Sequence, residues 1–241
     1  MDWPARARDA ATLKDVDALV ADCRACPRLV AWREHVGRVK RRSFAGATYW
    51  ARGVPSFGDS SARVVIVGLA PAAHGGNRTG RMFTGDQSGD VLYAALYRTG
   101  FSNQPASVSK HDGLILHGVR LVAPVHCAPP ENKPTPEERD RCAPYLAREL
   151  ELLSPSLRVA VVLGAFGWQA LLATLAGAGW ELPRPRPKFG HGAESAVSHP
   201  DGRLLTLLGC YHPSQHNTFT GRLTPAMIDA VLLRARSQSG L

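Results

Sequence analysis

Residues 64–90, VVIVGLAPAAHGGNRTGRMFTGDQSGD, decide the fold. The stretch begins with four apolar, β-branched residues, Val64 to Val67, and Gly68 ends the run. A short apolar run of this kind predicts a buried strand. The polar loop that follows carries His74, Asn77, Arg78, Arg81, Phe83 and Asp86. Because open α/β sheets bind ligands beyond the carboxyl ends of their parallel strands, this loop is a candidate binding site.

The loop does not match the two common phosphate-binding patterns. It contains neither G-x-G-x-x-G nor G-x-x-x-x-G-K-[ST]. Its five glycines from Gly68 to Gly85 let the backbone approach a ligand closely, and the side chains around them indicate a flat, polar one. Glycine-rich strand-to-helix connections also occur without a catalytic role, so the loop alone is compatible with both interpretations.

The rest of the chain predicts an α/β fold. Apolar runs indicate three further strands, at 119–125, 159–163 and 204–208. Helices are predicted within residues 1–35 and at about 89–97, 136–153, 165–177 and 225–236. Strands alternating with helices indicate a central, mainly parallel, four-stranded sheet flanked by helices in three α/β/α layers. We expect residues 1–241 to form a single domain.

Charge and composition indicate a polyanionic partner. The chain has 241 residues, a formal net charge of +9 and an isoelectric point near 9.8. Such a balance favours nucleic acid. No stretch reaches the ~18 apolar residues of a membrane span, and the N-terminus lacks an apolar signal-peptide core. We therefore expect a cytoplasmic protein that does not associate with membranes, and we expect a monomer.

Four of the five cysteines form a candidate metal site. They are Cys23, Cys26, Cys127 and Cys142. A disulfide framework is not expected in a cytoplasmic chain of this size. Thiols of this number, two of them in a C-x-x-C motif, suit zinc or an iron–sulfur cluster, and unconnected structural thiols are the alternative. The fifth, Cys210, lies at the end of an apolar strand and is interpreted as a core residue.

Four short motifs in combination resemble those of a known family. They are GLAPA followed by AHG (68–75), GRMFTGD (80–86), CAPP with NKP (127–134) and HPS (212–214). The chain resembles the uracil-DNA glycosylase superfamily from about Cys23 to its last helix, and within it the iron–sulfur enzymes of family 5, type B. Type A enzymes have a Glu after the first Gly of the first motif, where this chain has Leu69. Ala72 stands where other branches often place a polar group. The usual water-activating side chain is therefore missing from the first motif.

The resemblance implies a function and a cofactor. It implies a base-excision-repair enzyme that flips uracil out of double-stranded DNA and hydrolyses the N-glycosidic bond, leaving an abasic site. No lysine stands out in the predicted pocket loops except Lys133, so we expect a monofunctional enzyme without a Schiff-base step. It suggests that other deaminated bases such as hypoxanthine are also removed. It further implies that Cys23, Cys26, Cys127 and Cys142 hold a structural [4Fe-4S] cluster, which ties the N-terminal helix and loop to the domain.

Chemistry and resemblance together assign roles to individual residues. The predicted catalytic residues are Asp86 and His212. The predicted base-binding residues are Gly68, Ala70, His74, Phe83 and Asn132. The candidates for contacts with DNA phosphates are Ser214, Asn217 and Arg222. Phe83 would stack on the base, and the amide of Asn132 would read its edge. Each has a structural alternative, as a core aromatic and as a turn asparagine.

Bond cleavage needs stabilisation of charge on both fragments. His212 would donate a hydrogen bond to uracil O2, where negative charge develops, and its alternative is an ordinary loop histidine. Asp86 would stabilise the oxocarbenium-like sugar or position the attacking water, with His74 in reserve. The alternative for Asp86 is a helix N-cap.

Two other classes of protein share some of these features. A non-catalytic, cluster-bearing nucleic-acid-binding module would have the same charge and cysteines, and a redox protein would use the cluster for electron transfer. The binding module would not require Phe83, Asn132 and His212 to lie together. A redox protein would need an accessible cluster and a partner surface, and nothing in the sequence argues for either.

Overall fold

The computed structural model describes residues 3–241, so the first two residues of the helical region expected at 1–35 lie outside the described part. From Trp3 onward that region contains separate helices: α1 (Trp3–Ala7), α2 (Leu13–Asp22) and α3 (Pro27–Val39). The region is helical as predicted, apart from breaks at residues 8–12 and 23–26. Thr12 starts α2 by accepting a hydrogen bond from the Asp15 amide, and the chain is extended at Cys23 and Cys26 before Pro27.

The central sheet has six strands in the order β1-β3-β2-β4-β6-β5. Their bounds are β1 (Phe57–Gly58), β2 (Val64–Val67), β3 (Val119–Val122), β4 (Val159–Leu163), β5 (Glu194–Ser198) and β6 (Leu204–Cys210). The inner four, β3-β2-β4-β6, are parallel and confirm the strands predicted from sequence. The prediction of four strands missed the antiparallel edge strands β1 and β5. One is only two residues long, and the other is largely exposed, so neither forms an apolar run.

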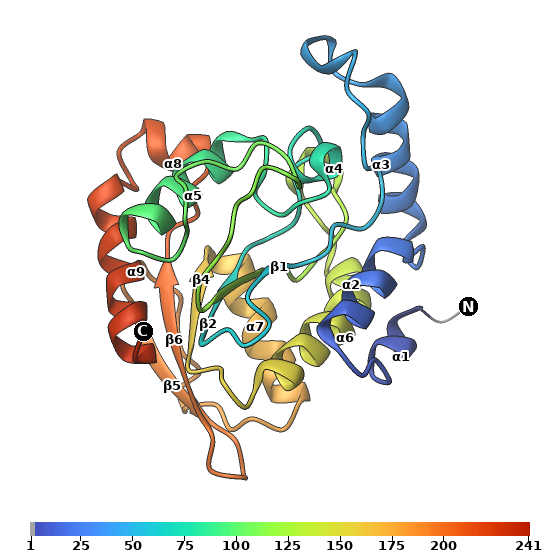
Figure 1. Cartoon of the computed structure of the whole chain (residues 1–241). Coiled ribbons are helices and arrows are strands. Elements are labelled where there is room, and N and C mark those ends of the chain that lie inside the picture. Colours follow the sequence, from blue (N-terminus) through green and yellow to red (C-terminus); the bar gives the residue numbers. More distant parts are fainter. Residues whose placement is uncertain (1–2) are drawn as a thin grey trace.

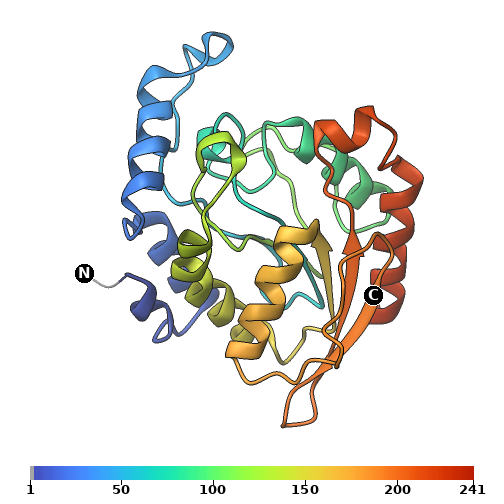
Figure 2. The same ribbon diagram turned by 180° about the vertical axis from the view of Figure 1, so that it is seen from behind.

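Helices cover both faces of the sheet, as predicted for three layers (Figures 1 and 2). Successive residues of β2 alternate between the faces: Val64 and Ile66 pack on one side, with α5 (Gln87–Arg98) and α9 (Pro225–Ser239). Val65 and Val67 pack on the other, with α6 (Pro136–Leu153) and α7 (Ala165–Gly177). Two-sided burial is the reason why β2 is apolar throughout.

The strand register brings the loops together. Val67 pairs with both Val122 and Val162, and Leu163 pairs with Cys210. The four parallel strands therefore end at one edge of the sheet. The short elements of this edge are α4 (Gly76–Thr79), η2 (Pro130–Asn132) and α8 (Gln215–Phe219), and η1 (Arg42–Phe44) follows α3.

Among the described residues, no helix combines the length and the apolar character needed to cross a bilayer.

Candidate active site

A cavity of about 720 Å³ opens at the carboxyl edge of the sheet. Of the residues predicted for the site, it is lined by Ala70, His74, Phe83, Asp86, Asn132, His212 and Ser214. They come from loops that lie far apart in the sequence and meet because the strands end in register. Three other predicted residues, Gly68, Asn217 and Arg222, are not among those that line the cavity.

Phe83 is held in an unusual conformation beside Gly68. Its backbone φ is +52°, in the left-handed region that non-glycine residues rarely adopt. A Cβ atom on Gly68 would lie 2.7 Å from Cζ of Phe83, so the ring occupies the space that a side chain there would need. The ring faces His212, with the two ring centroids 6.3 Å apart. Gly68 thus serves the site by making room for Phe83 rather than by lining the cavity.

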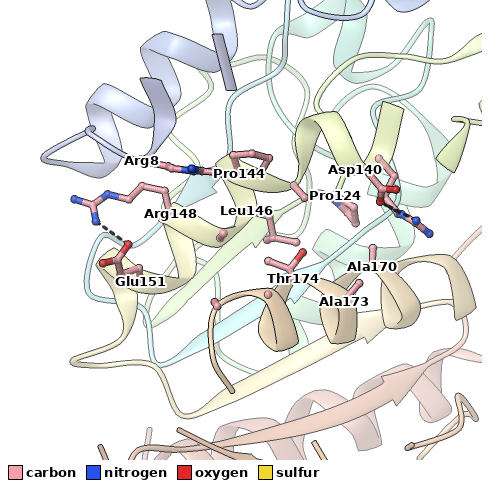
Figure 3. A pocket seen from close by; sticks show the side chains of 15 residues that line it. Arg8, Pro124, Asp140, Pro144, Leu146, Arg148, Glu151, Ala170, Ala173 and Thr174 are labelled. Carbon is pink, nitrogen blue, oxygen red and sulfur yellow. Dashed lines mark hydrogen bonds and ion pairs between the residues drawn. The ribbon is translucent and has the colours of Figure 1, made fainter. Parts of the chain in front are cut away.

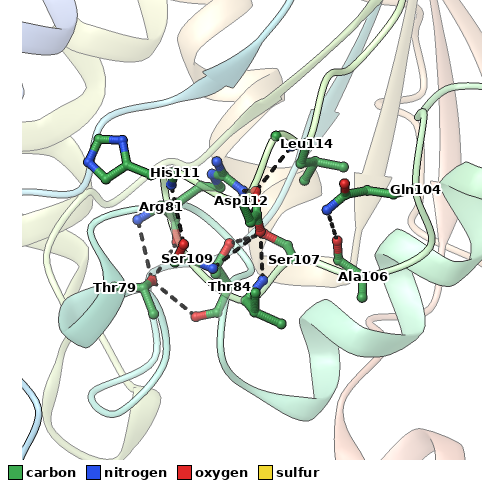
Figure 4. A network of polar contacts seen from close by, with 12 residues as sticks. Thr79, Arg81, Thr84, Gln104, Ala106, Ser107, Ser109, His111, Asp112 and Leu114 are labelled. Carbon is green, nitrogen blue, oxygen red and sulfur yellow. Dashed lines mark hydrogen bonds and ion pairs between the residues drawn. The ribbon is translucent and has the colours of Figure 1, made fainter.

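A polar network fixes the backbone on both sides of Phe83 (Figure 4). Buried Arg81 forms a 2.7 Å ion pair with Asp112 and donates a hydrogen bond to the Ser107 hydroxyl. Ser107 in turn shares a 2.7 Å hydrogen bond with Thr84. The Asp112 carboxylate accepts hydrogen bonds from Arg81 and from backbone amides, which hold its pKa down at about 2 despite its burial.

His212 stands opposite Phe83, at the end of β6. Surrounding protein atoms exclude water from the ring, and this desolvation of the charged form lowers the pKa of His212 to about 4. The imidazole is therefore neutral at pH 7, and as a neutral ring it can still donate one hydrogen bond. The backbone carbonyl of His212 accepts a 2.9 Å hydrogen bond from the Asn217 amide side chain, which fixes the loop.

Asp86 has the helix-capping role that was the alternative from sequence, and it also lies at the cavity, while its catalytic role stays a prediction. It is the N-cap of α5, because Oδ1 accepts a 3.1 Å hydrogen bond from the Gly89 amide. It also lines the cavity. A Cβ atom on Gly75 would lie 2.1 Å from Oδ2, so that oxygen is packed against the first motif loop. Burial raises the pKa of the carboxyl group above its usual value.

His74 and Asn132 occupy other parts of the cavity wall. The Nδ1 atom of His74 lies 2.9 Å from the Tyr49 hydroxyl, and burial, with a smaller contribution from nearby arginines, lowers the pKa of the ring. Asn132 is exposed, with φ at +57°. Asparagine adopts this conformation more readily than most residues, so the proline-rich turn presents the amide at the rim.

The three residues predicted to contact phosphates have internal contacts. Ser214 is the N-cap of α8, and Asn217 is hydrogen-bonded within the same loop. The guanidinium of Arg222 lies 4.6 Å from the centroid of the Tyr211 ring. These contacts show that Ser214 and Asn217 shape the His212 loop, and their role toward phosphate remains a prediction.

Several residues that line the cavity were not predicted to do so: Arg41, Phe44, Gln87, Ser88, Gln215 and His216. The last four directly follow predicted site residues, so proximity in sequence could have identified them. Arg41 was predicted only as part of a basic stretch that is either a solvated loop or faces phosphates. Arg41 and Phe44 come from the irregular basic stretch before β2, whose position no local pattern reveals.

The four predicted cysteine ligands line a second, much smaller cavity. Cys23 and Cys26 lie between α2 and α3, Cys127 follows β3, and Cys142 belongs to α6. Burial raises the pKa of Cys127 to about 11 and that of Cys142 well above its usual value. The described part of the chain contains no group of three or more His, Cys, Asp or Glu side chains arranged to hold a metal ion. Cys210 is fully buried in the core, as predicted.

Polar groups without partners surround the thiols. His126 and Tyr145 line the small cavity, and the Nε2 atom of His126 and the hydroxyl of Tyr145 are buried without a hydrogen-bond partner. Buried Arg33 donates a hydrogen bond to Sγ of Cys127 at 2.9 Å. Buried polar groups are rarely left unpaired, so the Arg33 guanidinium and the Tyr145 hydroxyl suit a group in the cavity that carries acceptors. The Nδ1 atom of His126 lies 2.8 Å from the Val54 carbonyl and donates to it, so the Nε2 atom of the neutral ring is an acceptor.

A third cavity, of about 560 Å³, lies between α6 and α7 (Figure 3). None of the sequence motifs contributes to it. Four of its charged residues form pairs, Arg148 with Glu151 at 2.7 Å and Arg139 with Asp140 at 2.7 Å. The cavity at the carboxyl edge is therefore the better candidate for the active site.

Fold and site together define a class: an α/β/α protein that receives a flat, polar ligand at the carboxyl edge of its parallel sheet. The family model of the "Uracil DNA glycosylase superfamily" matches residues 55–236. The chain is 53% identical to the "Type-5 uracil-DNA glycosylase" of Mycobacterium tuberculosis, over 96% of this chain and 84% of the relative.

Two further relatives carry the same name. The protein of Thermus thermophilus is 52% identical over 91% of this chain and 94% of its own length. The protein of Mycobacterium leprae is 50% identical over 96% of this chain and 98% of its own length. The chain belongs to the uracil-DNA glycosylase superfamily and, within it, to the type-5 family.

The environment of His212 predicts its titration. An unperturbed histidine takes up a proton at about pH 6.5, whereas the folded-state pKa of His212 is about 4. The neutral ring therefore stabilises the folded state fully above pH 6.5, and this stabilisation is lost as the pH falls from 6.5 to about 4. NMR titration of the ring nitrogens, assigned with a His212→Asn variant, should show this low pKa. A value of 6.5 or above would contradict the described environment.

Proposed function

We propose that this protein is a base-excision-repair DNA glycosylase that removes uracil from DNA by hydrolysing the N-glycosidic bond. The observation that carries the proposal is the convergence of Phe83, Asn132, Asp86 and His212 around one cavity. A base inside a duplex cannot reach such a cavity, so the nucleotide must leave the stack. A nucleic-acid-binding module or a redox protein would have no need of this convergence.

The geometry assigns complementary tasks to the two sides of the cavity. Phe83 supplies a flat apolar face for the base, and Asn132 offers one acceptor and two donors to its polar edge. Neutral His212 donates a hydrogen bond toward O2, where negative charge grows as the bond breaks. Because the ring is already neutral, it acts by donating a hydrogen bond and leaves the proton on its own nitrogen.

Asp86 faces the sugar side in this arrangement. One carboxylate oxygen is committed to the α5 cap, while the group as a whole stabilises the positive charge that develops on the sugar. Its raised pKa also suits the carboxylate to accept a proton from the attacking water. Leu69, which also lines the cavity, offers no acid at the first motif, so Asp86 takes the part that a first-motif carboxylate would have.

Two further features support the details of the proposal. Among the described residues that line the cavity there is no lysine, which favours a monofunctional enzyme without a Schiff-base step. The wall near the base includes Ala70, Ala72 and Ala73, whose small side chains leave space for deaminated purines such as hypoxanthine.

We also propose that Cys23, Cys26, Cys127 and Cys142 bind a [4Fe-4S] cluster. Four thiols around one cavity match its ligand number, and Arg33 and Tyr145 offer hydrogen-bond donors to its sulfurs. The positive charge of the iron would compensate for the burial that disfavours thiolates. When bound, the cluster supplies a crosslink between α2, α3, β3 and α6, and we assign it this structural role.

Partner and location follow from the same proposal. Double-stranded DNA is the substrate, and the reducing cytoplasm suits a chain in which none of the five cysteines forms a disulfide. A single chain provides every residue of the proposed site, so a monomer is sufficient for activity.

Uracil excision is tested with a labelled duplex that contains one uracil. Purified protein followed by alkali should cut the labelled strand at that position, and intact strands before the alkali step should show that no lyase step occurs. A duplex with thymine in place of uracil is the control, and a duplex with hypoxanthine tests the wider range. No alkali-sensitive product from the uracil duplex would reject the function.

Asp86→Asn separates catalysis from helix capping. Asparagine is as good an N-cap as aspartate, so the variant should fold normally. Losing one preorganised charge interaction should slow single-turnover cleavage by about 10²–10³-fold, and His212→Ala should have an effect of the same order. Affinity for an abasic product duplex should change far less in both variants.

Glu137→Gln is the control, because Glu137 is an exposed acid in the first turn of α6 and does not line the cavity. It should cleave at nearly the wild-type rate. A wild-type rate for Asp86→Asn would remove Asp86 from the mechanism and leave His74 as the candidate.

The cluster is tested by anaerobic purification. The protein should be brown, absorb broadly in the visible range and contain about four irons per chain. Cys127→Ala should lose iron, whereas Cys210→Ala, at a buried position remote from the thiol cavity, should retain it. Colourless protein with one zinc per chain would overturn the assignment.

A further inference from the structure

A basic arm extends from the last two residues of α3 into the segment that follows. We define it as residues 38–46, which include the cations Arg38, Lys40, Arg41 and Arg42. No Asp or Glu occurs from residue 35 to residue 58, so the charge of this segment is uncompensated along the chain. Figures 1 and 2 both show the end of α3 and the following loop projecting on the side of the molecule where α4 and α8 lie. The arm thus stands beside the entrance of the cavity.

Asn77 and Arg78, which lie in α4 just after the first motif, hold the chain on both sides of the arm. Before the arm, the amide side chain of Asn77 donates a 3.2 Å hydrogen bond to the carbonyl of Arg33. After the arm, the backbone amides of Trp50 and Ala51 each donate a 3.0 Å hydrogen bond to the carbonyls of Arg78 and Asn77, respectively. The position of the arm is therefore fixed relative to the loop that forms the cavity.

The arm also reaches the cavity wall through Arg41 and Phe44. The guanidinium of Arg78 lies 4.1 Å from the centroid of the Phe44 ring, and it is further held by the carbonyls of His74 and Gly85. Arg78 is thus occupied in supporting the loop. The charge of Arg41 contributes to the lowered pKa of His74, which places this cation close to the site.

The arm's arginines differ from those nearby in forming no ion pair, although the lowered pKa of Glu34, caused mainly by its hydrogen bond from Arg24, also reflects the charge of Arg38. Arg24, Arg28 and Arg52 each form an ion pair, with Glu34, Glu138 and Asp22, respectively. Within residues 3–241, no ion pair involves Arg38, Arg41 or Arg42, and all three are exposed. Exposed guanidinium groups that form no ion pair suit phosphate oxygens, which their planar forks bind in pairs.

We propose that the basic arm binds the backbone phosphates of the DNA strand that carries the flipped nucleotide, with Arg41 nearest to that nucleotide. The inference rests on the proposed function and adds a contact surface that the HPS loop does not provide. Contacts to phosphate position the duplex without reading its sequence, so the arm governs affinity and leaves the choice of base to the cavity.

The test measures binding of an abasic-site duplex between about 50 and 200 mM salt. Arg41→Ala/Arg42→Ala should weaken binding and reduce the slope of log Kd against log salt by about 0.9 for each lost phosphate contact. The ratio of uracil to hypoxanthine excision should stay at the wild-type value. The single variant Arg41→Lys keeps the charge, so its slope of log Kd against log salt should be close to that of the wild type.

Arg158→Ala/Arg203→Ala is the matched control, because these residues directly precede β4 and β6 and so lie near the opposite edge of the sheet. It should bind with the wild-type slope. If the wild type cleaves uracil but the arm variant matches its affinity and slope, the arm has no part in binding. If the wild type neither binds nor cleaves DNA, the proposed function itself fails, and the arm inference with it.

Discussion

The register of the four parallel strands is the constraint on which the site depends. Val67 lies between Val122 and Val162, and Leu163 pairs with Cys210, so four loops leave the sheet at one edge. Helices on both faces require apolar side chains on both sides of β2 and β4, and this burial fixes the register because a slip by one residue would exchange the faces. Phe83, Asn132 and His212 converge only because those strands end together.

Arg33 connects this site to the thiol cavity. Its fully buried guanidinium contacts Sγ of Cys127 and the carbonyl of Cys23, while its own carbonyl accepts the hydrogen bond from Asn77 in the first motif loop. Helix α3 therefore lies between the proposed cluster and the proposed base pocket. A crosslink at its amino end would orient both the first motif loop and the basic arm, which explains how a structural cluster can matter to DNA binding without taking part in the chemistry.

Sequence predicted the parts of this protein that depend on local patterns. Apolar runs identified the four inner strands, and Thr135 and Thr224 marked the starts of α6 and α9. The edge strand β5 was not predicted, because an exposed strand has no apolar run. The support of Phe83 by Arg81 and Asp112, and the place of Arg41 at the cavity, depend on contacts between distant segments. Motif combination identified the family, whereas the position of Asp86 both at the helix cap and at the cavity required the geometry.

The central claim is that uracil leaves the helix and enters the cavity between Phe83 and His212. The most direct measurement is a crystal structure of the wild-type protein with a duplex that carries 2′-fluoro-2′-deoxyuridine, whose glycosidic bond resists cleavage. The account predicts an extruded uracil stacked on Phe83, with its polar edge toward Asn132 and O2 toward His212. A uracil that remains stacked in the duplex, or one bound in the groove between α6 and α7, would contradict it.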